Sequence, residues 1–296
     1  MKQYAYFPGC SMDSTAVTYK KSTDFLINKL GIELKEIPDW CCCGSTAAHT
    51  KNENTALSLA ARNLAIAESA FPGLDVVTPC ASCYSRLAYA SFAGKNDELK
   101  RQQIEKFIDR PFKAEADILS FLDMFSDEEI MEEIKNKVVR NLTGLKVACY
   151  YGCLYSRPRH ITGQTCTEYP MNMDKLMALT GAEAVDWDFK CECCGASHQV
   201  DAPKQSRPLI DRIFRNAQAN GAQAIITACP LCNMNLDMRE EEINKTYSRK
   251  YNIPVYQFTE ILAIALGAKA DESGIHNHFY PAFKLINDVL SGKAGK

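Results

Sequence analysis

The sequence predicts an α/β protein made of two duplicated Rossmann-like units, each with a parallel sheet and with metal clusters at the carboxyl ends of the strands. Three observations support this prediction: apolar runs alternate with helix-patterned segments, one cysteine pattern occurs twice, and the residues around the cysteines repeat as well. Strands that alternate with helices are typical of parallel α/β units. The internal repeat means that both halves adopt the same architecture.

The repeated pattern contains ten of the fourteen cysteines. Each copy has a Gly-Cys, then a Cys-Cys-Gly, then a Cys-x-x-Cys. The first copy contains Cys10, Cys42, Cys43, Cys80 and Cys83. The second copy contains Cys153, Cys193, Cys194, Cys229 and Cys232. Five thiols in the same order, twice, predict one metal site in each half.

The flanking residues repeat too. The segment YAYFPGC at 4–10 resembles VACYYGC at 147–153, and VVTPC at 76–80 resembles IITAC at 225–229. An aromatic residue precedes each double cysteine, at Trp40 and Trp187.

These matches divide the chain near residue 144. A chain of 296 residues suits two domains of about 150 residues each. Residues 1–143 form the first predicted domain and residues 144–296 the second. The first ends in a charged linker at about 95–143, expected to form one or two surface helices. The charge runs Asp127–Glu133 and Arg239–Glu242 are expected to be solvated helix faces.

The alternation gives specific elements. In the first half, strands are expected at 4–8, 32–37 and 74–78, and helices at 15–30, 53–70 and 83–94. In the second half, strands are expected at 145–150, 183–187, 224–228 and 255–257, and helices at 171–180, 205–219, 258–266 and 280–291. Cys10, Cys80, Cys153 and Cys229 each follow a predicted strand, where binding sites of parallel sheets gather.

Composition excludes several classes of protein. A net charge of −2 and a pI of about 6.2 disfavour a nucleic-acid binder. Neither a GxGxxG nor a GKS/GKT signature occurs, so we predict that this chain itself binds no nucleotide. No apolar run is long enough for a membrane span, and the first ten residues are typical of a strand and not of a signal peptide. We therefore expect a cytoplasmic protein with reduced thiols.

The thiol sets themselves suggest the metal. Thiolates are soft ligands that favour zinc, copper(I) or iron–sulfur clusters. A structural zinc ion takes four ligands, whereas each set offers five, two of them adjacent. Adjacent cysteines suit a larger cluster, in which neighbouring irons take neighbouring thiolates. A zinc-bound structural module, or one zinc site beside one cluster, stays open as an alternative.

These motifs resemble the cysteine-rich CCG domain, and the whole chain resembles the B-type subunit of heterodisulfide reductase. The resemblance implies an α/β unit around each motif and a non-cubane 4Fe–4S cluster held by five cysteines. It implies that Cys10, Cys42, Cys43, Cys80 and Cys83 hold the first cluster. It implies that Cys153, Cys193, Cys194, Cys229 and Cys232 hold the second.

The same resemblance implies a function. In this family the two clusters face a shared cavity, where a disulfide is reduced to two thiols in one-electron steps and iron binds each sulfur. The substrate in methanogens is CoM-S-S-CoB, the mixed disulfide of coenzymes M and B. The usual partners are a ferredoxin-like iron–sulfur subunit of the C type, which delivers electrons, and a flavin-containing subunit of the A type. Helix 258–266 and segment 95–143 are candidate docking surfaces.

A second hypothesis is an electron-relay subunit of another oxidoreductase complex, which passes electrons on without binding a disulfide. Such a role resembles that of CCG proteins attached to succinate or hydroxy-acid oxidoreductases. Two complete thiol sets favour the catalytic interpretation, because a relay needs no open iron sites.

Several residues outside the repeat have two interpretations. Cys41 and Cys191 are alternative ligands beside the double cysteines, whereas Cys149 is expected to be a core thiol and Cys166 a free or buried one. His49 and His198 are candidate proton donors near the clusters, or ordinary loop histidines. His160, with Arg157 and Arg159, could bind an anionic substrate group or be surface charge. His276 and His278 are expected to be tail residues.

Overall fold

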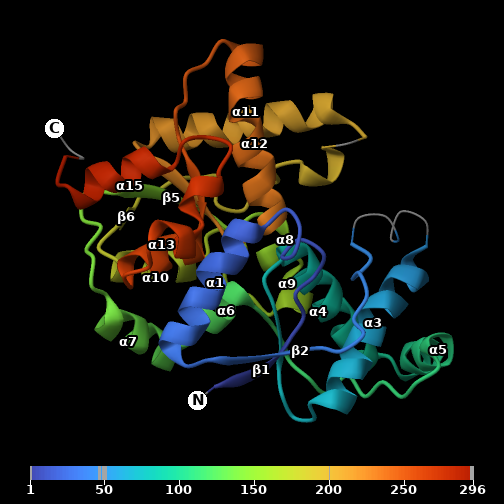
Figure 1. Ribbon diagram of the computed structural model, residues 1–296. Coiled ribbons are helices and arrows are strands. Elements are labelled where there is room, and N and C mark those ends of the chain that lie inside the picture. Colours follow the sequence, from blue (N-terminus) through green and yellow to red (C-terminus); the bar gives the residue numbers. More distant parts are fainter. Residues whose placement is uncertain (1, 46–47, 49–51, 200, 294–296) are drawn as a thin grey trace. The chain divides into compact units, whose positions relative to one another are not determined.

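The computed structural model describes residues 2–45, 48, 52–199 and 201–293 (Figure 1). The chain forms two compact units, each discontinuous in sequence. The first unit consists of Met1–Cys10, Gly31–Met124 and Leu154–Thr167; the second consists of Ser11–Leu30, Phe125–Cys153 and Glu168–Lys296. The division into domains 1–143 and 144–296 stays a prediction about the sequence repeat, because the compact units exchange segments across it.

The first unit contains a four-stranded sheet in the order β2-β1-β3-β4. Its strands are β1 (Gln3–Tyr6), β2 (Glu33–Glu36), β3 (Val76–Thr78) and β4 (Ile118–Ser120). All neighbouring pairs are parallel. The predicted fold class is therefore confirmed in this half.

Strand β4 was not predicted. It lies inside 95–143, which also contains α5 (Glu98–Ile108), α6 (Phe121–Phe125) and α7 (Glu128–Lys137). The expectation of surface helices alone was wrong, because three residues within a charged segment give no detectable alternation. The acidic run on α7 is solvated as predicted, with Glu128, Glu129, Glu132 and Glu133 exposed or partly exposed.

Helices α3 (Glu53–Ala70) and α4 (Ala81–Asn96) pack together in the first unit, with α5 beside them (Figure 1). The N-cap of α3 is Asn52, whose side chain accepts hydrogen bonds from the N–H groups of Asn54 and Thr55. Segment 154–167, with α9 (Arg159–Thr162), belongs to this unit. It is held there by Tyr84, whose hydroxyl donates to the Thr162 carbonyl at 3.0 Å.

The second unit repeats the topology in the order β6-β5-β7-β8, again with parallel pairs throughout. Its strands are β5 (Lys146–Tyr150), β6 (Glu183–Ala184), β7 (Ala224–Thr227) and β8 (Val255–Gln257). Its other elements include α10 (Asn172–Leu179), η1 (Ala196–His198), α11 (Pro203–Ala219), α12 (Pro230–Tyr247), α14 (Ala270–Ser273), η2 (Ile275–Asn277) and α15 (Phe283–Leu290). The duplicated architecture is thus confirmed.

Helix α1 (Val17–Leu30) follows β1 in sequence but belongs to the second unit, where it packs on α13 (Phe258–Ala265) (Figure 1). Ser22 Oγ lies 2.7 Å from Thr259 Oγ1 in this contact. Every residue of α13 is buried. The interpretation of helix 258–266 as a docking surface was therefore wrong, because a helix buried on all sides offers no face to a partner.

The charge run Arg239–Glu242 is also less solvated than predicted. Glu240 is only 1 % exposed, and its Oε1 accepts a hydrogen bond from the Ile253 N–H at 3.2 Å. Burial raises the pKa of Glu240 to about 7. One side of α12 thus packs into the second unit.

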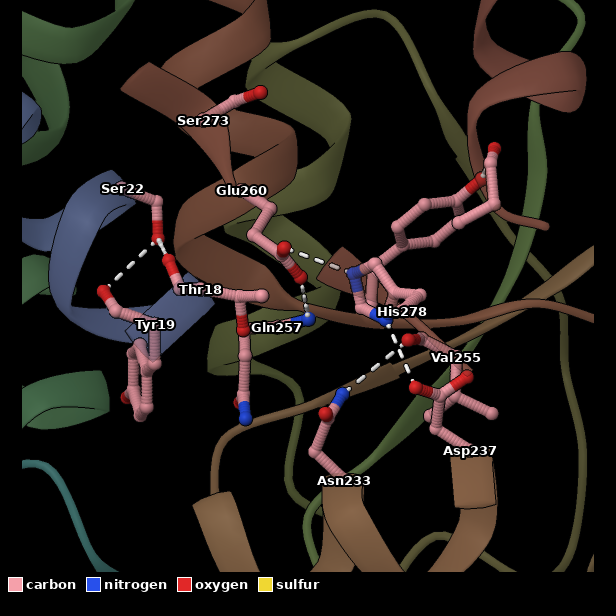
Figure 2. A network of polar contacts seen from close by, with 12 residues as sticks. Thr18, Tyr19, Ser22, Asn233, Asp237, Val255, Gln257, Glu260, Ser273 and His278 are labelled. Atoms are coloured by element: carbon pink, nitrogen blue, oxygen red, sulfur yellow. Dashed lines mark hydrogen bonds and ion pairs between the residues drawn. The ribbon is translucent and has the colours of Figure 1, made fainter. Parts of the chain in front are cut away.

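His278 is not a tail residue but the centre of a buried charge network (Figure 2). Its side chain is 2 % exposed; Nε2 lies 2.9 Å from Glu260 Oε1, and Nδ1 lies 3.2 Å from Asp237 Oδ2. Asp237 also accepts the backbone N–H groups of Phe279 and Tyr280. The network ties the C-terminal segment to α12 and α13. Burial alone lowers the pKa of His278, but Glu260 and Asp237 outweigh it and raise that pKa to about 10.

Replacing His278 with Gln is expected to destabilise the protein in a pH-dependent way. A histidine whose pKa is raised on folding contributes stability that is fully present below its unfolded pKa of about 6.5 and is lost as the pH rises through about 10. Anaerobic denaturant unfolding at pH 6 should show a loss of about 3 to 5 kcal/mol, the usual cost of breaking a buried ion pair. The loss should shrink steadily towards pH 10.

His276 provides the matched control. It is exposed and its ring packs against Phe283 at 4.4 Å between centroids. His276→Gln should change stability little at any pH. An equal, pH-independent loss in both variants would contradict the assignment of the network.

Candidate metal centres

The thiols of both sets lie where the strands end. Cys10 follows β1 by four residues, and Cys153 follows β5 by three, at the start of α8 (Cys153–Ser156). Cys80 and Cys229 each stand between a strand and a helix, as the N-cap residues of α4 and α12. This placement is common to both units. It brings each thiol set to the carboxyl edge of its own sheet, as predicted.

Within each unit one pair of sulfur atoms is in contact. Cys43 Sγ lies 3.3 Å from Cys83 Sγ, and the equivalent pair, Cys194 and Cys232, is separated by 3.5 Å. The neighbouring thiols that shift the pKa values of these cysteines include the other members of each set. Cys83 also hydrogen-bonds to Cys80. The charge of Cys10 acts on Cys42, and those of Cys194 and Cys229 act on Cys153.

In each set the pKa of one thiol is lowered. Hydrogen bonds from Cys42 and then Cys83 lower the pKa of Cys43 to about 3, although its burial acts in the opposite direction. A hydrogen bond from Cys153 lowers the pKa of Cys193 to about 6, and the Gly195 N–H and the His198 charge add to this. The pKa of each donating thiol is raised in return. Deprotonated sulfur is the form that binds metal.

The glycines of the motifs are required because the backbone there passes close to a cysteine sulfur. Gly9 and Gly152 have φ of +68° and +75°. A Cβ atom would lie 3.1 Å from Cys83 Sγ at Gly9 and 3.3 Å from Cys232 Sγ at Gly152. Any other residue would enter the space next to the sulfurs, in addition to the cost of a positive φ.

The loops before the double cysteines are held by different residues in the two units. In the first, Asn63 accepts the Cys41 N–H at 2.8 Å and donates to the Cys41 carbonyl at 2.9 Å. In the second, the Tyr150 hydroxyl donates to the Glu192 carbonyl at 2.5 Å. Sequence reasoning missed both residues. The one signal comes from aligning the repeats: Phe7 is equivalent to Tyr150 and has no hydroxyl, so the two loops cannot be held in the same way.

A buried ion pair supports the second centre and was also missed. Lys190 Nζ lies 2.6 Å from Asp174 Oδ1, with side chains 1 % and 6 % exposed. The Lys190 carbonyl accepts the N–H groups of Tyr151 and Gly152, so this residue fixes the turn that leads into Cys153. A lone lysine in a loop gives no sequence signal of burial.

The remaining predicted residues lie in varied places. Cys149 is fully buried, and burial raises its pKa, which fits a core thiol. Cys191 is buried, Cys41 is half-buried and Cys166 is exposed. His198, in η1, is half exposed, with Nδ1 3.8 Å from Asp201 Oδ1. His49 lies outside the described residues.

The anion site predicted around His160 stays a prediction. His160 and Arg159 are exposed on α9, and the His160 ring packs edge-on against Phe92 at 5.5 Å between centroids.

Each set fits an iron–sulfur cluster by the chemistry of its donors, which are sulfur throughout, and by the glycine space beside them. Across the described ranges, no three His, Cys, Asp or Glu side chains are arranged to hold a single metal ion. The five-thiol groups are therefore candidate metal sites, on the type of their donors and on the contact between sulfurs.

Fold and sites together define a duplicated α/β protein with one cysteine set, a candidate soft-metal site, in each half. The chain belongs to the cysteine-rich domain (CCG) family, whose model matches residues 4–88 and 147–237. Its full-length relatives include B-type subunits of heterodisulfide reductases, in agreement with the resemblance inferred from the motifs.

Three known proteins illustrate the relationship. The chain is 32% identical to the 8-methylmenaquinol:fumarate reductase membrane anchor subunit of Wolinella succinogenes, over 96% of this chain and 99% of that protein. It is 29% identical to the B-type subunit of the ferredoxin/F420H2-dependent CoB-CoM heterodisulfide reductase of Methanosarcina acetivorans, over 100% of this chain and 99% of that one. A crystal structure of a hypothetical protein from Helicobacter pylori shares the fold, with a TM-score of 0.72 and 14% identity over 94% of this chain and 52% of that chain.

Wolinella's protein is named a membrane anchor subunit. In the part of this chain that the structure describes, none of the helices combines the length and apolar character needed to span a bilayer.

Replacing Gly9 or Gly152 with Ala is expected to empty one metal centre. The added Cβ would enter the space beside Cys83 or Cys232. If each thiol set holds a cluster, each variant should lose roughly half of the bound iron, because only one set is disturbed. Iron and acid-labile sulfide measured on anaerobically purified protein check this.

Gly163 and Gly221 are matched controls. Both have positive φ, but a Cβ there meets no heavy atom of the described residues within 4 Å. Gly163→Ala and Gly221→Ala should keep full iron. Equal losses in all four variants would attribute the effect to backbone strain and not to the centres.

Proposed function

We propose that this chain is the catalytic iron–sulfur subunit of a heterodisulfide reductase-type complex, which reduces a disulfide to two thiols. The observation that carries the proposal is the pair of complete five-thiol sets, one at the carboxyl edge of each parallel sheet. The two sets would hold two 4Fe–4S clusters of the non-cubane type. Cys10, Cys42, Cys43, Cys80 and Cys83 are the proposed ligands of the first, and Cys153, Cys193, Cys194, Cys229 and Cys232 those of the second.

The exposure of the thiols supports an open side on each centre. In the first set Cys10 and Cys42 are exposed, whereas Cys43, Cys80 and Cys83 are buried. In the second, Cys193 is exposed while Cys194 and Cys229 are buried. Buried thiols anchor a cluster, and the exposed ones mark the side from which a substrate sulfur could approach.

When bound, a 4Fe–4S cluster supplies electrons singly and irons that bind sulfur. The overall reaction consumes two electrons and two protons for each S–S bond and yields two thiols. The chain's own contribution is to hold the thiolates, to exclude water from the buried side and to supply protons. His198, whose charge acts on Cys193, is the proposed proton donor at the second centre. His49 is the corresponding proposal at the first.

The electrons must come from partners. We propose a ferredoxin-like iron–sulfur subunit of the C type and, behind it, a flavin-containing subunit of the A type. The relatives named as subunits of heterodisulfide reductase complexes support such an assembly. The sequence of this chain contains no dinucleotide-binding signature, which agrees with nucleotide binding by a partner.

A specific observation favours a second candidate. The Wolinella relative, at 32% identity over nearly the whole chain, is named as a subunit of a methylmenaquinol:fumarate reductase. In that case the same two centres would relay electrons between partner subunits, and no disulfide would bind. The relay hypothesis keeps the ligand assignment and changes only what reaches the open side of each centre.

The test is anaerobic purification followed by metal analysis and EPR, before and after oxidation in the presence of thiols. The catalytic proposal expects about eight irons per chain, four for each cluster, and a paramagnetic signal that changes when a thiol binds. With the electron-donating partner added, disulfide reduction should be lost by at least a hundredfold in Cys42→Ser and Cys193→Ser. Cys166→Ser, outside both sets and exposed, is the matched control and should keep activity.

Other outcomes have definite meanings. Full iron with no response to any thiol would reject the catalytic proposal and support the relay. Four irons with one zinc would reject the two-cluster assignment. Disulfide reduction that persists in Cys42→Ser and Cys193→Ser after their clusters are lost would reject the mechanism.

A further inference from the structure

The residues that pack behind the double cysteine, called the wall below, differ between the two metal centres. A Cβ atom at Gly44 would meet Ala48 Cβ at 3.2 Å, Ala56 Cα at 3.3 Å and a Leu59 methyl carbon at 3.3 Å. A Cβ atom at Gly195 would meet the Cα and Oγ atoms of Ser206, both at 3.0 Å. Ala56 and Ser206 occupy equivalent places on α3 and α11. The wall is therefore apolar in the first unit and carries a hydroxyl in the second.

Ser206 is buried with unused hydrogen-bonding capacity. Its residue exposure is 0%, and its Oγ has no hydrogen-bond partner among the residues the structure describes. Helical serines usually satisfy their hydroxyl on a carbonyl of the preceding turn, so an unsatisfied one calls for an explanation. Gly195, against which Ser206 packs, donates its N–H to Cys193 Sγ at 3.3 Å. The hydroxyl thus stands beside the loop that carries the second double cysteine.

Asn235 gives a second, independent observation at the same loop. Its Nδ2 donates to the Cys194 carbonyl at 2.8 Å. Its Oδ1 is buried and has no hydrogen-bond partner within the described ranges. The equivalent residue in the first repeat is Arg86, which pairs with Glu53 at 3.1 Å instead. Two buried polar groups with spare capacity thus flank Cys194 and Gly195.

We propose that Ser206, with Asn235 holding the adjacent Cys194 backbone, gives the second metal centre a higher reduction potential than the first. The inference rests on the proposed function in one respect, namely that both thiol sets hold iron–sulfur clusters. Ser206 and Asn235 act as positioning residues, since neither is a ligand. Electrons that enter the chain would accordingly settle on the second centre.

The direction follows from electrostatics. Reduction adds negative charge to a cluster, and a hydrogen bond to its sulfurs stabilises that charge and raises the potential. A donor acts more strongly in a buried, weakly polarisable environment than in water. Ser206 offers the second centre a buried hydroxyl beside the Gly195 backbone, whereas Ala56, at the equivalent place, offers no hydroxyl to the first.

The test is a potentiometric titration of the anaerobic full-length protein, followed by EPR. The two signals are assigned by their loss in Cys42→Ser and Cys193→Ser. In Ser206→Ala the signal of the second centre should move to a lower potential while the first stays in place. In the reciprocal variant Ala56→Ser the signal of the first centre should move to a higher potential. Iron content should stay at the wild-type value in both.

Asn235→Ala tests the supporting residue and should shift only the second signal. If Ser206→Ala loses iron, the reciprocal Ala56→Ser decides, because it leaves the second centre intact. Unchanged potentials in both variants, or a first centre with the higher potential in wild type, would overturn the inference. Wild-type protein with fewer than two iron clusters would count against the proposed function, whereas two clusters that ignore both substitutions count against this inference alone.

Discussion

The gathering of cysteines at the carboxyl edge of each parallel sheet is the constraint on which the rest of each unit depends. Deprotonated thiols gathered this closely would repel one another, so the scaffold must hold them together. It does so with short strands that end at a common edge and with helices that begin at Cys80 and Cys229. Hydrogen bonds shared among the thiols spread the charge, which leaves one low-pKa sulfur in each set.

Duplication preserved this geometry while the supporting contacts diverged. The carbonyl before the double cysteine is held by Asn63 on α3 in one unit and by Tyr150 on β5 in the other. Both solutions satisfy a backbone group that burial would otherwise penalise. The motif therefore fixes where the sulfurs lie, whereas the residues around it are free to set charge and polarity. Differences between two otherwise equivalent centres are expected to reside in these neighbours.

The sequence predicted the fold class and the thiol positions because both depend on local signals. The alternation that gave β1, α3 and β8 is a periodicity, and the repeat made each assignment twice. Strand β4 and the burial of His278 escaped because they depend on partners distant in the chain. Tertiary contacts alone reveal that Ser206 and Asn235 have side-chain groups without a hydrogen-bond partner among the described residues, since nothing in their sequence context distinguishes them from solvated residues.

The mismatch between sequence repeats and compact units has a further consequence. Helix α13 is buried along its whole length, and α1 from the first repeat supplies part of its cover. Segment 154–167 of the second repeat is likewise part of the first unit, anchored by Tyr84. A cut near residue 144 would leave each half without an element that its core requires, exposing apolar surface at a cost of about 25 cal/mol for each Å². Folding alone therefore keeps the two thiol sets in one chain.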